Sequence, residues 1–196
     1  MNIYGVIIDV ELSRYPGLTA KQIARSVLLD NGFKEDDIIP RLNRYMEDLP
    51  YSYYNVAWSD RVVVREGAQE LLDEMSKEKI LIGIATGEPE RVAKMRLDKV
   101  KMGHYFSFGA YGEDGMLFND ILSKSIRIAR ENDFQEDEGI VIVSNPVSVS
   151  ISKILGMKTV ALETGDARGK DLIAAGADLV VKSFREIPKI INKIND

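Results

Sequence analysis

Six short apolar segments alternate with longer segments of helical periodicity, and this alternation limits the fold more than any other feature of the sequence. Most of the apolar segments, such as IVIVS at 140–144, are continuously apolar, which is typical of strands buried on both faces of a parallel sheet. Strand, helix, strand at this spacing predicts right-handed crossovers, so we expect an α/β fold with a doubly wound, mostly parallel sheet. The expected strands lie at 3–9, 80–85, 107–111, 140–144, 158–162 and 178–182.

The segments between these strands are expected to be helical. In 119–131, for example, Ile121, Leu122 and Ile126 fall on one stripe of a helix, while Lys124 and Arg127 fall off it. The expected helices of the sheet-forming part lie at 66–78, 88–101, 119–131, 147–155, 168–175 and 184–194.

One interval, from residue 14 to residue 65, breaks the alternation. Residues 19–31 predict a helix that is capped by Thr19 and stopped at Gly32, and 36–48 predict a second one. The aromatic segment at 51–58 is expected to be irregular. We therefore interpret 14–65 as a small, mostly helical insertion after the first strand.

Composition excludes several classes of function. The net charge of −5 argues against binding to nucleic acid or to a membrane surface. The chain has no cysteine, which removes disulfides, thiolate metal sites and a cysteine nucleophile. Neither a signal peptide nor an apolar stretch of about 20 residues is recognisable. We expect a cytoplasmic protein with no nucleic-acid or membrane partner.

Candidate site residues follow the strands. In an open parallel sheet, ligands bind at the carboxyl ends of the strands, close to the point where the strand order reverses. Asp9 and Glu11 follow the first strand, Thr86 and Gly87 the second, and Asn145 the fourth. Each of these polar residues is also explained by an ordinary strand end or helix cap, so only their combination indicates a site.

That combination resembles a known family. An apolar strand that ends in Asp9, a helical insertion, REGAQELLDEMSKEKILIGIATGEPERV at 65–92 and IVIVSNPVSVSISKILGMKTVALETG at 140–165 are similar to the haloacid dehalogenase superfamily. The likeness is greatest to its phosphoglycolate-phosphatase-like members. The resemblance implies a Rossmann-like core at 1–13 plus 66–196 and a small cap at 14–65.

The resemblance also implies roles for individual residues. Asp9 matches the nucleophile, which would form an aspartyl phosphate, and Glu11 stands where the family has an aspartate as general acid and base. Thr86, followed by Gly87, matches the residue that hydrogen-bonds the phosphoryl group. The family's cation is expected near 116–118, where this chain has none, and Lys124 is the nearest basic residue downstream.

The metal motif departs from the family pattern. Mg²⁺ in this family is held by carboxylates after the fourth strand, but here Asn145 stands in the leading position and Ser148 follows in place of an acid. The resemblance leaves Asp9, Glu11 and Asn145 as the candidate ligands of a weakened Mg²⁺ site.

Three interpretations remain open at the level of sequence. The first is a phosphatase-like hydrolase that acts on a small phosphorylated metabolite through Asp9, with eroded metal and cation motifs. The second is a catalytically inactive binding or regulatory protein on the same scaffold. The third is a metal-free, dehalogenase-like hydrolase, suggested by Ser144-Asn145. A small cap leaves the site open, which suits a large substrate or closure by a second subunit of a homo-oligomer.

Overall fold

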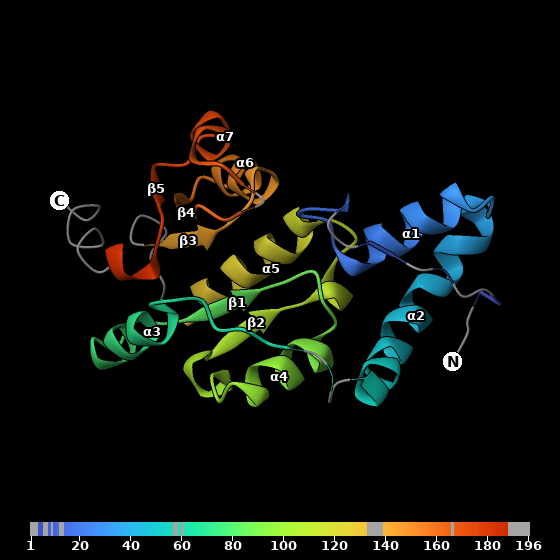
Figure 1. The fold of residues 1–196 in the computed structure, drawn as a ribbon, viewed down its shortest axis with the longest axis horizontal. Helices are drawn as coiled ribbons and strands as arrows, with labels where there is room; N and C mark the ends of the chain where they lie inside the picture. Colours follow the sequence, from blue (N-terminus) through green and yellow to red (C-terminus); the bar gives the residue numbers. More distant parts are fainter. Residues whose placement is uncertain are drawn as a thin grey trace.

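The fold was analysed in a computed structural model of the 196-residue chain. The structure describes residues 4–5, 8, 10–11, 14–56, 59, 61–132, 139–165 and 167–187. Figure 1 shows the sheet-forming part, with its helices, on one side and a two-helix insertion on the other.

The described strands form two parallel sheets. Strands β1 (Gly83–Ala85) and β2 (Phe108–Ala110) pair in one sheet, and β3 (Ile140–Val143), β4 (Lys158–Leu162) and β5 (Leu179–Val181) form the other in that order. Every pairing is parallel, and Val160 at the centre of β4 lies between Ile142 and Leu179. This confirms the predicted α/β class and five of the six predicted strands, each within a few residues.

Helices cover both faces of the three-stranded sheet. Val160 and Leu162 face a cluster with Leu71 of α3 (Ala68–Lys77), whereas Ala161, on the other face, packs with α6 (Pro146–Ile154) and α7 (Gly169–Ala174). Because successive side chains of a strand point to opposite faces, the apolar sequence VAL at 160–162 is buried on both sides.

Helix α5 (Phe118–Arg130) joins the two sheets. Its buried residues Leu122 and Ile126 pack against Ala85 of β1 and Val141 of β3 in one cluster. Figure 1 shows α5 crossing between the sheets, with α4 (Glu90–Lys99) on the far side of β1 and β2. The predicted apolar stripe of this helix therefore holds the two halves of the core together.

The insertion consists of two packed helices, α1 (Ala20–Asp30) and α2 (Glu35–Val56). As predicted, α1 is capped by Thr19, whose hydroxyl accepts the N–H of Gln22, and the chain turns at Gly32 with φ of 84°. Buried residues of both helices, among them Leu28, Ile38 and Leu42, form a cluster separate from those of the sheets.

Helix α2 is longer than predicted. It continues through residues 51–56, which were expected to be irregular, so for these residues the prediction is wrong. The guanidinium carbon of Arg91 lies 5.1 Å from the ring centre of Tyr51, and that of Arg96 lies 5.3 Å from that of Tyr53. These cation–π contacts from α4 stabilise the aromatic end of α2 against the core.

The described residues at the start of the chain do not form the predicted strand at 3–9. Tyr4 lies in a turn and Ile8 in no regular structure. The Tyr4 hydroxyl donates to the Ile38 carbonyl at 3.0 Å, and the side chains of Tyr4 and Ile8 are partly buried against the α1–α2 cluster. The insertion, and not the sheet, therefore covers these two side chains. At the other end, the predicted helix at 184–194 begins as a 3₁₀ turn at Phe184–Glu186, and its part beyond residue 187 lies outside the described residues.

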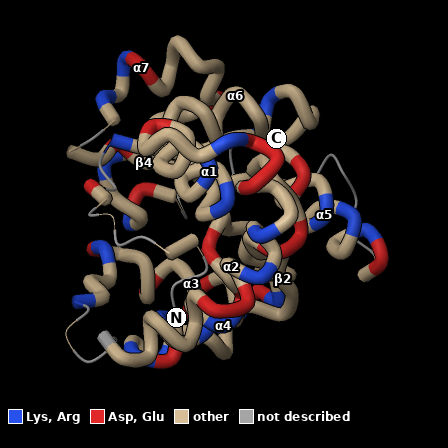
Figure 2. The backbone as a smooth tube through the Cα atoms, turned by 90° about the vertical axis from the view of Figure 1, so that its right-hand side faces the viewer, with Lys and Arg blue, Asp and Glu red and all other residues tan. Residues whose placement is uncertain are grey.

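Charged residues of both signs lie interspersed along the helices that face the viewer in Figure 2. Within the described part of the chain, no helix is both long enough and apolar enough to cross a bilayer.

The role of α5 predicts a large effect of truncating Leu122, which is 4% exposed. Leu122→Ala leaves a cavity between the two sheets, so we expect it to lower the free energy of unfolding by about 2–5 kcal/mol. Leu117→Ala, at a position 48% exposed, serves as control and should change it by less than about 0.5 kcal/mol. Urea unfolding of both variants measures the difference, and similar losses would contradict a joining role of α5.

A second prediction concerns pH and the ion pair that ties α6 to the turn before β5. Burial alone would raise the pKa of Asp178, but hydrogen bonds from Lys153 Nζ and the Thr159 N–H outweigh it and hold this pKa below its usual value. The carboxylate therefore stabilises the fold above the unfolded-state pKa of about 4, and this contribution is lost as pH falls through the lower folded pKa. We expect Asp178→Asn to unfold at a lower urea concentration than wild type at pH 7, and this difference in midpoint to become smaller towards pH 3. A difference in midpoint that does not change with pH would contradict the ionic contribution.

Candidate active site at the ends of β1 and β3

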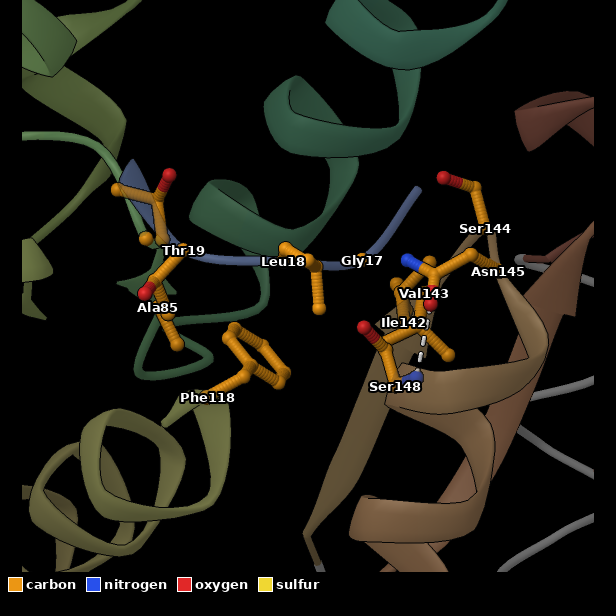
Figure 3. A pocket seen from close by; sticks show the side chains of 12 residues that line it. Gly17, Leu18, Thr19, Ala85, Phe118, Ile142, Val143, Ser144, Asn145 and Ser148 are labelled. Carbon is orange, nitrogen blue, oxygen red and sulfur yellow. Dashed lines mark hydrogen bonds between the residues drawn. The ribbon is translucent and has the colours of Figure 1, made fainter. Parts of the chain in front are cut away.

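A cavity of about 270 Å³ opens where β1 and β3 end. Its walls come from four places: the turn after β1, the turn from β3 into α6, the segment that leads into α1, and Phe118 at the start of α5 (Figure 3). This is the carboxyl-end position predicted for a ligand site in a parallel sheet. The lining residues are Gly17, Leu18, Thr19, Ala85, Thr86, Gly87, Phe118, Ile142, Val143, Ser144, Asn145 and Ser148.

The turn after β1 presents Thr86 and Gly87 to the cavity. The Thr86 N–H donates to the Ala110 carbonyl at 3.0 Å, which extends the pairing of β1 with β2 and fixes the residue in place. The Thr86 hydroxyl accepts the Glu88 N–H at 3.3 Å, which leaves its own proton available to a ligand oxygen.

The insertion docks directly on this turn. The Ala20 N–H donates to the Gly87 carbonyl at 3.0 Å, and a Cβ at Gly87 would lie 2.6 Å from the Cα of Thr19. The Thr19 hydroxyl donates to the Met116 carbonyl at 2.7 Å, and Lys21 Nζ to the Glu113 carbonyl at 3.2 Å. The first turn of α1 is thereby fastened to two loops of the core, and only a glycine at 87 allows so close an approach.

The wall at the end of β3 is the N-terminus of α6. Asn145 is the N-cap residue, and its Oδ1 accepts the Ser148 N–H at 2.8 Å, as the dashed line in Figure 3 shows. Gly17 lies directly over this oxygen, since a Cβ there would come within 2.7 Å of it. The positive φ of Gly17, 77°, is a second reason for glycine at this position.

The structure brings together three of the predicted site residues, Thr86, Gly87 and Asn145. Two others that it describes lie elsewhere. Lys124 forms an ion pair with Asp114 and does not line the cavity, and Glu11 pairs with Arg14 at 2.9 Å with both side chains largely exposed. Asp9 lies outside the described residues, so its role as nucleophile stays a prediction.

The described part of the cavity wall is uncharged. None of the described lining residues is an acid or a base, and nowhere among the residues that the structure describes do three His, Asp or Glu side chains gather as metal ligands. Mg²⁺ in proteins is held by oxygen ligands that include carboxylates. The described wall offers hydroxyl and amide oxygens only, so it does not fit this ion.

Sequence reasoning missed two parts of the site. Ser148 was considered only because it stands where the family has an acid. However, Asn145 followed by Pro146, with Ser148 three positions after Asn145, is a recognisable helix start in which the Asn145 side chain accepts the Ser148 N–H. The wall at residues 17–19 could not be found, because its place depends on contacts with residues far along the chain.

Comparisons with known proteins identify the family. Residues 2–162 match the model of the haloacid dehalogenase-like hydrolases. The chain therefore belongs to the haloacid dehalogenase-like hydrolase family. A curated relative, phosphoglycolate phosphatase of Pseudomonas fluorescens, is 24% identical over 137 residues, which are 68% of this chain and 50% of the relative. The chain thus spans about half the length of that relative.

Solved structures agree on the fold. A hydrolase from Pseudomonas syringae superposes with a TM-score of 0.70 at 19% identity, over 94% of this chain and 82% of that one. CbbY from Rhodobacter sphaeroides, solved in complex with phosphate, superposes with a TM-score of 0.66 at 16% identity, over 87% and 75% of the two chains. These likenesses establish a Rossmann-like α/β core of the haloacid dehalogenase type.

The close contact at Gly87 predicts that this residue is intolerant of a side chain. Gly87→Ala places a methyl group against the backbone of Thr19, so we expect a loss of about 1–3 kcal/mol in the free energy of unfolding. Gly165→Ala is the matched control, because a Cβ there meets nothing within 4 Å. Thermal or urea unfolding compares the two, and equal stabilities would show that the insertion does not rest on this turn.

Proposed function

We propose that this protein hydrolyses small phosphate monoesters through a covalent intermediate on Asp9. The observation that carries the proposal is that Thr86 and the N-terminus of α6 line one cavity at the carboxyl ends of β1 and β3. The family match from residue 2 to residue 162 includes the segment that contains Asp9.

In the proposed reaction, a carboxylate oxygen of Asp9 attacks phosphorus and the bond from phosphorus to the ester oxygen breaks. Glu11 pairs with Arg14 outside the cavity in the structure, so its role requires the side chain to turn into the site. There it protonates the departing alkoxide and then removes a proton from the water that hydrolyses the aspartyl phosphate, so the carboxylate and inorganic phosphate are released. The Thr86 hydroxyl donates to a non-bridging phosphoryl oxygen. Asp9 lies eight residues before Gly17 in the sequence. A fully extended chain of this length measures at most about 29 Å, so Asp9 is within reach of the cavity.

The substrate class follows from the cavity and the relatives. A volume of about 270 Å³ suits a small metabolite rather than a large one. The curated relative is a phosphoglycolate phosphatase, and CbbY binds phosphate in its solved complex. Both support a small phosphorylated molecule as the ligand. The sequence contains no cysteine, which suits a protein of the cytoplasm.

A second candidate function is binding of such a molecule without turnover. Phosphoryl transfer depends on positioning and on neutralising charge. Lys124, the candidate cation, is held by Asp114, and the oxygen of Asn145 is used as a helix cap. These two observations favour slow or absent turnover at a site that still holds a ligand.

Turnover assays separate the two candidates. Purified protein is incubated with p-nitrophenyl phosphate and a panel of phosphorylated metabolites, beside Asp9→Asn and the control Asp36→Asn, which lies on the exposed start of α2. We expect slow release of phosphate that Asp9→Asn abolishes and Asp36→Asn does not. Turnover retained in Asp9→Asn would contradict the proposed nucleophile. Ligand-induced stabilisation without turnover would establish the second candidate.

A further inference from the structure

We infer that the pocket binds its ligand without a divalent metal, because Asn145 serves the N-terminus of α6 and not a cation. This inference deepens the proposed function and rests on it for the identity of the site. Three observations carry it: the contacts of the Asn145 oxygen, the donors at the helix end, and the chemistry of the remaining wall.

The Asn145 oxygen is already engaged. Its Oδ1 accepts the Ser148 N–H at 2.8 Å, and the backbone at Gly17 packs so closely that a Cβ there would lie 2.7 Å from this atom. An amide oxygen carries a partial charge only, and here it already accepts a hydrogen bond. Binding to this oxygen would therefore stabilise a hard cation less than the water ligand that it replaces, and Mg²⁺ gives up its water ligands reluctantly.

The first turn of α6 satisfies most of its own donors. Pro146, the first residue of the helix, has no N–H, the Ser148 N–H goes to the Asn145 side chain, and the Val149 N–H goes to the Asn145 carbonyl at 3.1 Å. The Asn145 side chain therefore caps the helix, and its carbonyl accepts the first hydrogen bond within it. Its side chain has a structural task that explains the residue without a metal.

The rest of the wall supplies neutral oxygens. Thr86, Ser144 and Ser148 contribute hydroxyl groups, and none of the lining residues that the structure describes carries a charge. The acids of the loop at 112–117 are engaged as well, since Asp114 pairs with Lys124 and the Glu113 carboxylate accepts the Glu90 N–H at 3.0 Å. Hydroxyl donors suit a ligand oxyanion, which they bind directly, whereas a metal would find no carboxylate on this part of the wall.

One substitution separates the helix cap from the metal. Aspartate is as good an N-cap residue as asparagine, so Asn145→Asp keeps the cap and adds a carboxylate at the cavity wall. Asn145→Ala removes the cap and adds no charge. Asn132→Asp makes the same chemical change at the exposed end of α5, away from the cavity, and controls for added charge.

The test is thermal unfolding of the full chain and these three variants, each in millimolar MgCl₂ and in NaCl of equal ionic strength. For wild type, for Asn145→Ala and for Asn132→Asp, we expect the melting temperature of each protein to be the same in MgCl₂ as in NaCl. Asn145→Asp is expected to melt with wild type in NaCl and at a higher temperature in MgCl₂. No substrate is needed, so failure of the proposed hydrolysis leaves this test unaffected.

Two results would overturn the inference. A higher melting temperature of wild type in MgCl₂ than in NaCl would show that the native residues bind the ion. A folded Asn145→Asp that gains no more from MgCl₂ than Asn132→Asp would show that Asn145 is not what keeps the ion out.

Discussion

The site depends on a close backbone contact between the insertion and the core. The segment at 17–20 lies against the turn after β1 and against the Asn145 side chain, and it can do so only because Gly87 and Gly17 have no side chain. The hydrogen bonds from Ala20 and Thr19 then fix the first turn of α1. This contact adds the wall at residues 17–19 to the cavity between the two strand ends.

The same contact explains the chemical character of the site. The backbone at Gly17 lies close to the Asn145 oxygen that caps α6, and in the nearby loop Asp114 forms an ion pair with Lys124. The charges of this pair are therefore neutralised within the protein. The described surface of the cavity consists of hydroxyl groups, a helix end and apolar side chains. This arrangement suits direct binding of a small oxyanion more than binding through a metal.

Much of the core could be predicted from the sequence, because a parallel strand buried on both faces is continuously apolar and a strand end is marked by a polar residue. These local patterns predicted strands β1 to β5 and the position of Thr86 and Asn145 at the same cavity. They could not locate features that depend on distant partners. Arginines of α4 contact Tyr51 and Tyr53 at the end of α2, Lys124 pairs with a loop residue, and Tyr4 lies against α2 instead of in a strand.

The most direct test of this account is a crystal structure of the protein grown with inorganic phosphate and MnCl₂, in which manganese is located by its anomalous scattering. The account predicts a phosphate in the cavity, within hydrogen-bond distance of the Thr86 hydroxyl, and no anomalous peak between Asn145 and the phosphate. It also predicts that the Asn145 side chain still accepts the Ser148 N–H. A manganese ion coordinated by Asn145 Oδ1, with the cap of α6 broken, would contradict it.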